Sequence, residues 1–137
     1  EGLAEYFDGF EGQINPDQAS SEEVGELFRQ HDAAHVVFGT DISTVGEVLT
    51  DTWTLAATDM PMDKFSVYYN APEIKALLAE TSMWTFVWAG IKAMPRVVKI
   101  MWRGFRMKRK WPWAGFRDHL DRPLQEIRGE FGIRPMI

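Results

Sequence analysis

The sequence predicts an all-α fold, for three reasons. Apolar residues recur at three- and four-residue steps along most of the chain, which is the period of a helix with one buried face. No segment shows convincing two-residue alternation, although residues 65–69 could form a short strand. Of the 137 residues, 45% are hydrophobic and 26% are charged, as in one globular domain. We therefore expect residues 1–137 to form a single, mostly helical domain.

The first two expected helices lie in the N-terminal half of the chain. Ser20 and Glu23 form a capping-box pattern at the start of a helix that Gly39 is expected to end as a left-handed cap. A second helix is expected to begin near Ser43 or Thr44. It should stop at residues 58–63, TDMPMD, which carry turn signals.

Further helices are expected in the second half. A short one is predicted over residues 63–69. Pro72 suits the first position of a helix, so a long helix is expected from there, with a kink or break at Pro95. Residues 110–115 are predicted to form a loop, and the final helix should follow Asp121 and end near Gly132. No run of about 18 apolar residues exists, so no transmembrane helix is expected.

Charged residues are divided unequally between the two halves of the chain. Residues 1–80 hold 16 acidic and 3 basic residues, a net charge of −13, whereas residues 81–137 hold 4 acidic and 12 basic residues, a net charge of +8. Either the second half meets an anionic surface or ligand, or the two halves attract each other within the fold. Cysteine is absent, which excludes disulfides, thiolate metal ligands and cysteine nucleophiles.

Four side chains with metal-binding groups lie within 17 residues of sequence. His31, Asp32 and His35 fall in one sector of the first helix, because side chains advance by about 100° per residue. Glu47 follows on the second helix, after enough chain for an antiparallel return. Nitrogen and oxygen ligands of this kind suit a divalent cation such as zinc, iron or manganese. The sequence therefore predicts a metal site between two neighbouring helices, with His31, Asp32, His35 and Glu47 as ligands.

Each of these residues also has an ordinary explanation. A histidine pair four residues apart is common on helices, Asp32 could be solvated, and Glu47 could complete a capping box with Thr44. Other metal enzymes fit the spacing less well. Zinc peptidases place a glutamate beside the first histidine, where this chain has Asp32. Phosphohydrolases of the His-Asp superfamily need an upstream histidine, and none precedes His31.

The spacing H-D-x-x-H-x11-E of His31, Asp32, His35 and Glu47 resembles the metal signature of a known family. This is the coenzyme Q (ubiquinone) biosynthesis metalloprotein family, the fourth member of the numbered Coq series. The segment RPLQEIRGEFGI, residues 122–133, is similar to that family's closing segment. The two motifs occur in the expected order and together extend over most of the chain.

The resemblance implies more than the spacing shows. It implies that His31, Asp32, His35 and Glu47 hold a divalent metal, with zinc preferred to iron or manganese, and act in catalysis through it. The implied enzyme is a lyase that decarboxylates the ring of a prenylated 4-hydroxybenzoate-derived precursor, with hydroxylation in some descriptions. The alternative is a non-catalytic prenyl-lipid-binding scaffold that organises coenzyme Q biosynthetic enzymes.

The resemblance also implies a place in the cell and a set of partners. The expected location is the surface of a membrane, either the cytoplasmic face of a bacterial inner membrane or the matrix side of a mitochondrial inner membrane. The expected partners are the prenylated aromatic precursor, the membrane surface and other coenzyme Q biosynthesis proteins. A homodimer is a further option.

The second half of the chain is rich in both tryptophan and basic residues. Five of the six tryptophans lie between Trp84 and Trp113, interleaved with lysines and arginines from Lys92 to Lys110. Both residue types favour a membrane interface, so a peripheral membrane contact through this segment is expected. The alternative is that residues 83–91 pack in the core and the basic residues are solvated. Nucleic-acid binding is not expected, because the chain is net acidic and has no matching motif.

Overall fold

The expected helices form in a computed structural model of the chain, which describes residues 2–12 and 14–136. The all-α prediction is confirmed, and no strand occurs among the described residues. Residues 65–69 are helical, so a strand there is excluded. In order along the chain, the helices are α1 (Leu3–Asp8), α2 (Glu22–Phe38), α3 (Thr44–Ala57), α4 (Met62–Asn70), α5 (Pro72–Glu80), α6 (Met83–Phe105) and α7 (Leu124–Phe131), with short 3-10 turns at Pro16–Gln18 and Phe116–His119.

α2 begins one residue later than the capping-box pattern predicted. Its N-cap is Ser21, whose hydroxyl accepts a hydrogen bond from the Val24 N–H at 3.2 Å. Ser20 instead donates its hydroxyl to Glu73 of α5 at 3.2 Å. Gly39 ends α2 as predicted, with a φ of 70°, which glycine adopts without a Cβ clash. The chain can therefore reverse direction at once and enter α3.

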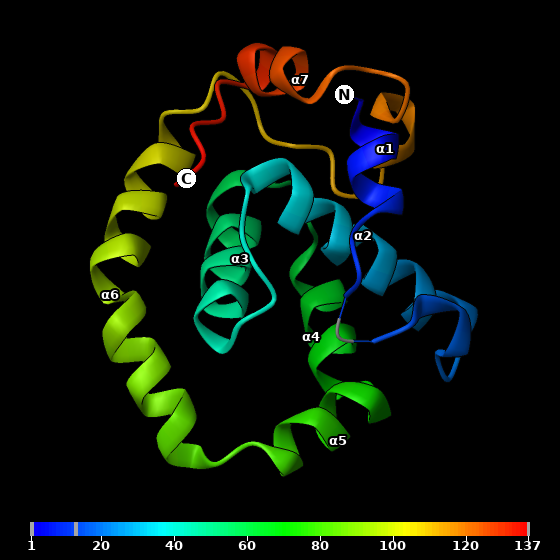
Figure 1. Cartoon of the computed structure of the whole chain (residues 1–137), viewed down its shortest axis with the longest axis vertical. Coiled ribbons are helices and arrows are strands. Elements are labelled where there is room, and N and C mark those ends of the chain that lie inside the picture. Colours follow the sequence, from blue (N-terminus) through cyan, green and yellow to red (C-terminus); the bar gives the residue numbers. More distant parts are fainter. Residues whose placement is uncertain (1, 13, 137) are drawn as a thin grey trace.

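The long helix expected from Pro72 is in fact two helices. α5 ends at Glu80, and extended backbone at Thr81 and Ser82 separates it from α6. A kink or a break was predicted at Pro95, and the break is excluded because α6 is helical throughout. Pro95 is exposed, and α6 curves along the outer edge of the molecule (Figure 1). Proline removes one backbone hydrogen bond from a helix. The helix tolerates this loss by curving, with its solvent-exposed side on the outside of the curve.

α6 makes its largest contact with α3, which lies inside it in Figure 1. The buried positions of α6 are mostly small, namely Ala89, Ala93 and Gly104. A Cβ atom at Gly104 would lie 2.8 Å from the Cβ atom of Ala56, which is closer than two carbon atoms pack. α6 is the longest helix, but neither it nor any other helix in residues 2–12 and 14–136 has the length and hydropathy of a bilayer-spanning segment.

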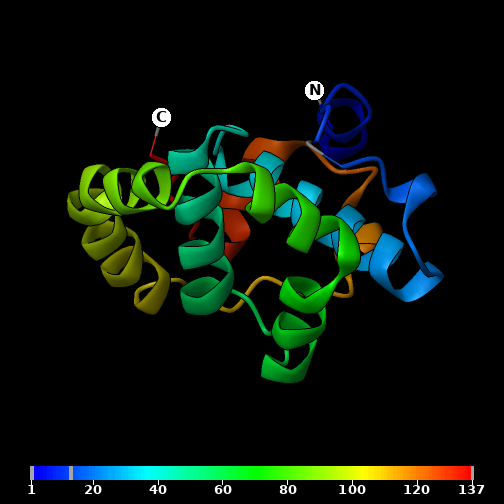
Figure 2. The same ribbon diagram turned by 90° about the horizontal axis from the view of Figure 1, so that it is seen from below.

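Two groups of buried side chains hold the helices together. The larger group joins α2, α3, α6 and α7, and includes Phe38 and Trp53, whose rings stack with centroids 4.8 Å apart. The smaller group joins α2 to α4 and α5 around Phe28 and Tyr68, whose rings meet edge to face. Figure 2 shows the same arrangement of helices from below. Because both groups include residues of α2, this helix is the one on which the two cores meet.

The loop predicted over residues 110–115 packs against the end of α3. Trp111 donates its backbone N–H to the Ala57 carbonyl at 2.8 Å and accepts from the Asp59 N–H at 3.2 Å. The backbone N–H of Trp113 donates to the Asp59 carboxylate at 2.7 Å. Both indole rings are buried. These two tryptophans are therefore core residues, and the prediction that they belong to a membrane-facing segment is wrong.

Candidate metal centre

α2 and α3 bring three of the four predicted ligands together. His31 and His35 lie one turn apart on α2, with ring centroids 4.7 Å apart, and Glu47 faces both from the first turn of α3. Nε2 of His35 lies 3.3 Å from Oε1 of Glu47, and Nε2 of His31 lies 3.5 Å from Oε2. One ligand atom of each residue lies within 4.8 Å of those of the other two. Both imidazoles are buried, whereas Glu47 is partly accessible.

The other ring nitrogen of His35 is held by two threonines. Nδ1 lies 3.1 Å from Oγ1 of Thr40 and 3.1 Å from Oγ1 of Thr50. Thr50 donates its own hydroxyl hydrogen to the Gly46 carbonyl at 2.9 Å, so its oxygen accepts from the imidazole. Nδ1 therefore carries a proton, and in the neutral imidazole Nε2 then has the lone pair that a metal ligand needs. Outer hydrogen bonds of this kind orient the histidines of metal sites and select their tautomer.

His31 has a buried ring nitrogen that lacks a hydrogen bond. Its Nε2 atom has no hydrogen-bond partner among the described residues. The carboxylates of Glu47 and Asp51 lie 3.5 and 3.7 Å from it, beyond a good N–H···O distance. The His31 ring also stacks on Tyr68 of α4, with centroids 5.0 Å apart. Burial alone would lower the pKa of His31, but Asp51 and Glu47 outweigh it and raise that pKa. The surroundings therefore favour positive charge at this nitrogen.

The tight turn between α2 and α3 aims Glu47 at the histidines. Ser43 is the N-cap of α3 and accepts a hydrogen bond from the Gly46 N–H at 3.0 Å. The alternative capping box, between Thr44 and Glu47, is therefore excluded, because Thr44 is already the first helical residue. A Cβ atom at Gly46 would lie 2.0 Å from the Asp41 carbonyl oxygen, so only glycine fits at this point of the turn. Glu47 is thus free of a capping role and lies over the centre.

Asp32 lies beside this group of three. Its carboxylate approaches the chain at Gly12, where a Cβ atom would lie 2.6 Å from Oδ1. Together with His31, His35 and Glu47 it lines a small cavity of about 30 Å³. Burial raises the pKa of Asp32 to about 6, against the opposing effect of the two histidines. A cation in this cavity would stabilise the ionised carboxylate. Asp32 stays a predicted ligand, next to a three-residue group that does not include it.

A second carboxylate, which the sequence analysis did not single out, faces His31. Asp51 lies one turn after Glu47 on α3, and its Oδ1 atom is 3.7 Å from Nε2 of His31. The hydroxyl of Tyr69 on α4 donates to Oδ2 of Asp51. Burial and then Asp51 raise the pKa of that hydroxyl. The available signal was the four-residue interval from Glu47 to Asp51, which puts both carboxylates on one face of a helix.

The three converging residues fit a divalent cation. In a tetrahedral zinc site with bonds of about 2.0–2.2 Å, neighbouring ligand atoms lie about 3.3–3.6 Å apart. The distances of 3.3 and 3.5 Å from the two histidines to Glu47 fall in this range, each measured to a different carboxylate oxygen. With one ligand atom taken from each residue, the three atoms lie within 4.8 Å of one another. The unpartnered nitrogen of His31 is the kind of buried polar atom that a bound cation would satisfy. His31, His35 and Glu47 therefore form a group that could hold a metal ion.

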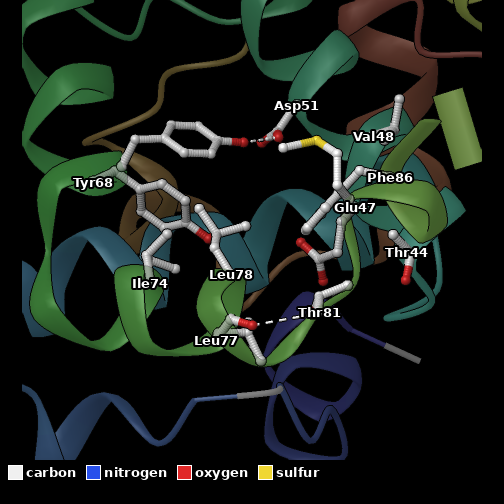
Figure 3. A pocket seen from close by; sticks show the side chains of 12 residues that line it. Thr44, Glu47, Val48, Asp51, Tyr68, Ile74, Leu77, Leu78, Thr81 and Phe86 are labelled. Atoms are coloured by element: carbon white, nitrogen blue, oxygen red, sulfur yellow. Dashed lines mark hydrogen bonds between the residues drawn. The ribbon is translucent and has the colours of Figure 1, made fainter.

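An apolar cavity of about 440 Å³ opens beside the centre. Glu47 and Asp51 border it from α3, and Figure 3 shows their carboxylates across the cavity from the side chains of α5. Most of the remaining wall is apolar and comes from α4, α5 and the start of α6. A bound molecule would meet carboxylates at one side and aliphatic and aromatic groups elsewhere. Such a lining suits a ligand with a polar head and an apolar body.

The third histidine of the chain lies away from the centre. His119 belongs to the second 3-10 turn, where its ring contacts those of Trp111 and Phe131 at centroid distances of 5.1 and 5.4 Å. Its Nδ1 atom lies 3.1 Å from the Arg122 guanidinium. Burial and the charge of Arg122 lower the pKa of His119. His119 therefore packs in the α7 region and contributes nothing to the candidate centre.

Comparison with known proteins adds no further assignment. No protein-family model matches the chain, and neither does any curated protein or solved structure. The residues of the centre and of the cavity beside it are therefore the evidence for function.

Proposed function

We propose that this protein is a metal-dependent enzyme of ubiquinone (coenzyme Q) biosynthesis. It would act as a lyase that removes the carboxylate from the ring of a prenylated 4-hydroxybenzoate-derived precursor. The spacing of His31, Asp32, His35 and Glu47, with its family resemblance, is the starting point. The observation that carries the proposal is the convergence of His31, His35 and Glu47 beside an apolar cavity of about 440 Å³. A precursor with an acidic ring and a prenyl tail matches both parts of this site.

The charges around the centre explain why an anionic ring needs a cation there. Glu47, Asp51 and Asp32 surround the two histidines and would repel a benzoate carboxylate or phenolate. A divalent cation held by His31, His35 and Glu47, with Asp32 as a further ligand, would supply a Lewis acid for that anion. Zinc suffices for decarboxylation alone, whereas coupled hydroxylation needs a redox metal such as iron.

The residues of the chain would bind the ring and return a proton to it. When the bond between ring carbon and carboxylate carbon breaks, carbon dioxide leaves, the electron pair stays on the ring carbon, and a proton must replace the lost group. The Tyr69 hydroxyl, hydrogen-bonded to Asp51 on the cavity wall, stays protonated because burial and Asp51 raise its pKa. We assign the proton return to Tyr69. The apolar wall around Leu77 and Leu78 would hold the prenyl tail and exclude water.

The proposed place of this reaction is a membrane surface, at the cytoplasmic face of a bacterial inner membrane or the matrix side of a mitochondrial one. A prenylated precursor stays in the bilayer, because each buried methylene contributes about 0.8 kcal/mol. An enzyme that acts on it must therefore work at the lipid surface. Enzymes that make or consume the same lipid are the proposed protein partners, and a homodimer also stays a proposal.

The replacement His35→Ala tests the proposed activity, with His119→Gln as the matched histidine control outside the centre. Purified wild-type protein should contain a divalent metal by elemental analysis. It should also convert a prenylated 4-hydroxybenzoate to the decarboxylated product, detected by mass spectrometry. His35→Ala should lose the metal and the activity together, whereas His119→Gln should keep both. Turnover by metal-free protein, or by His35→Ala, would reject the mechanism.

The rival function is a non-catalytic scaffold that presents prenylated intermediates to partner enzymes. The hydrogen bonds that join Nδ1 of His35 to the hydroxyl oxygens of Thr40 and Thr50 favour it, because they also suit a structural metal that joins α2 to α3. The same incubation separates the two functions. Binding of the precursor without conversion, under both aerobic and reducing conditions, is the result expected of the scaffold.

A further inference from the structure

α6 exposes a continuous apolar face. At about 100° per residue, its large exposed apolar residues fall within a sector of about 140° on the side opposite Ala93, which is buried against α3. The face extends along a helix about 34 Å long. Soluble monomers rarely leave an apolar patch of this extent in water. We call it the α6 face, and its members are Met83, Trp84, Val87, Trp88, Ile91, Met94, Val98, Trp102 and Phe105. All of them are exposed, so the alternative that residues 83–91 pack in the core is wrong for Met83, Trp84, Val87, Trp88 and Ile91.

One edge of the α6 face is basic. By the same helical spacing, the basic residues of α6 and its C-cap occupy the adjoining sector, and no acidic residue occurs between Glu80 and Asp118. The three tryptophans of the face lie toward this basic edge, and the Arg106 guanidinium lies 4.6 Å from the centroid of the Trp102 ring. The basic residues of this edge are Lys92, Arg96, Lys99 and Arg106. Arg103 lies in the same sector, but its guanidinium donates to the carbonyls of Arg134 and Pro135 at 2.7 and 2.8 Å.

We propose that the α6 face docks on an anionic phospholipid bilayer, with α6 lying flat in the interface. The inference deepens the proposed function, on which it rests for the membrane as the place of work. Apolar side chains would enter the acyl boundary, tryptophans would sit at headgroup level, and the basic edge would meet lipid phosphates. This order of apolar, tryptophan and basic positions around the helix is what a membrane interface requires.

A second copy of the chain fits the α6 face less well. Two α6 helices packed antiparallel through these faces would bring their basic edges together, because residues on the same flank meet in that arrangement. α6 has no acidic residue that could offset the repulsion. The three basic residues at positions 108–110 are engaged within the fold: Lys108 donates to the Gly129 carbonyl, Arg109 pairs with Glu130, and Lys110 donates to the Ala56 carbonyl. The membrane contact expected of the whole basic segment is thus narrowed to α6.

The apolar cavity beside the metal centre adjoins the α6 face. Met83 belongs to both, since it lines the cavity and is 74% exposed. Phe86, on the next turn of α6, lines the cavity as well (Figure 3). A bilayer on the α6 face would therefore lie next to the apolar wall of the cavity. A prenylated molecule could then pass from lipid to Glu47 without crossing water.

Vesicle co-sedimentation of the whole chain tests the docking surface. Wild-type protein should bind vesicles of phosphatidylcholine mixed with phosphatidylglycerol more tightly than vesicles of phosphatidylcholine alone. The double variant Trp84→Ser/Trp88→Ser should lower the partition coefficient by about tenfold or more, since it removes two interfacial anchors. Leu55→Ser/Met62→Ser, which removes two exposed apolar side chains outside α6, is the matched control and should bind like wild type.

A second pair of variants tests the charge and keeps the test independent of the tryptophans. Lys92→Gln/Lys99→Gln should weaken binding to the anionic vesicles by about tenfold or more, since each basic residue near the surface contributes roughly a fivefold factor. Lys75→Gln/Arg117→Gln removes the same charge from exposed positions outside α6 and should change binding less than twofold. That change is well below the roughly fivefold factor expected for each basic residue near the surface. Circular dichroism should show unchanged helix content in all four double variants.

Three results would overturn the docking surface. The first is that wild-type protein does not bind anionic vesicles. The second is that test and control variants lose binding equally. The third is that ultracentrifugation shows a wild-type dimer, that Trp84→Ser/Trp88→Ser dissociates it, and that neither wild type nor this variant binds vesicles. The assay needs no metal, so metal-free and metal-loaded protein should bind alike. Failure here is therefore distinct from failure of the decarboxylation assay.

Discussion

Replacement of Thr50 by valine should weaken metal binding without touching a ligand. Thr50 is fully buried, its hydroxyl accepts from Nδ1 of His35 at 3.1 Å, and it donates to the Gly46 carbonyl at 2.9 Å. Valine has nearly the same shape but removes both hydrogen bonds, and with them a third one that joins this hydroxyl to Oγ1 of Thr40 at 2.5 Å. His35 would keep only Thr40 as a partner for Nδ1. The imidazole would then be less firmly held in the tautomer that presents Nε2 to a cation.

The size of the effect follows from these contacts. Loss of an outer hydrogen bond to a metal-binding histidine costs about 10–100-fold in affinity. Because Thr40 remains, we expect the lower end, about tenfold, which corresponds to about 1.4 kcal/mol. The metal-free protein should also lose about 1–3 kcal/mol of unfolding free energy, since three hydrogen bonds are removed and each contributes about 1 kcal/mol. Competitive zinc titration against a chelator and urea unfolding measure the two quantities.

Thr54→Val is the matched control for this experiment. Thr54 lies one turn further along α3 and is also buried, but its hydroxyl has no hydrogen-bond partner among the described residues. Its replacement should leave zinc affinity unchanged and should not lower stability, because an unsatisfied hydroxyl is removed. A zinc affinity of Thr50→Val within twofold of wild type, or an equal loss in Thr54→Val, would refute the role assigned to Thr50.

Three other predictions concern proton binding and packing. In metal-free protein, burial raises the pKa of Asp32 to about 6, so the free energy of unfolding should fall as pH rises from about 4 to 6. Asp32→Asn should abolish this dependence on pH. Above pH 6 the variant should be more stable than wild type by at most about 3 kcal/mol, measured by urea unfolding. Asp51→Asn should lower the pKa of His31, measured by NMR titration of metal-free protein, because the Asp51 carboxylate helps to raise it; an unchanged pKa would contradict the contact. Gly104→Ala should destabilise the protein by about 1–3 kcal/mol, because its Cβ would clash with α3. The control Gly90→Ala, whose Cβ meets nothing within 4 Å, should stabilise the protein by up to about 1 kcal/mol. Equal shifts of the thermal midpoint in the two variants would argue against the α3–α6 packing.

The centre combines features that oppose stability with features that suit a ligand. A buried nitrogen of His31 lacks a hydrogen bond, Asp32 is held with a raised pKa, and two further carboxylates crowd the same space. Without a cation, each of these raises the free energy of the folded state. Local disagreement of this kind with ordinary core packing is typical of functional sites. It is the reason for assigning function to this part of α2 and α3 and not to the core around Trp53.

The sequence by itself determined the features that depend on residues close together along the chain. The helical spacing of His31 and His35 follows from the backbone hydrogen bonds of one helix, and Gly39 ends that helix because it adopts a positive φ. The short turn to α3 then limits Glu47 to the neighbourhood of both rings. For this reason the fold class and three members of the centre could be predicted before the structure was known.

Tertiary packing alone decided the features that depend on distant residues. Whether a tryptophan is exposed depends on which helix covers it: Trp84 faces out because α3 packs against the small residues of α6, and Trp111 is buried because its loop docks on the end of α3. The hydrogen bond from the Tyr69 hydroxyl to Asp51 forms only because α4 lies beside α3. Periodicity along one segment carries no information about its neighbours in space, because contacts between helices arise from shape and apolar burial across the whole chain.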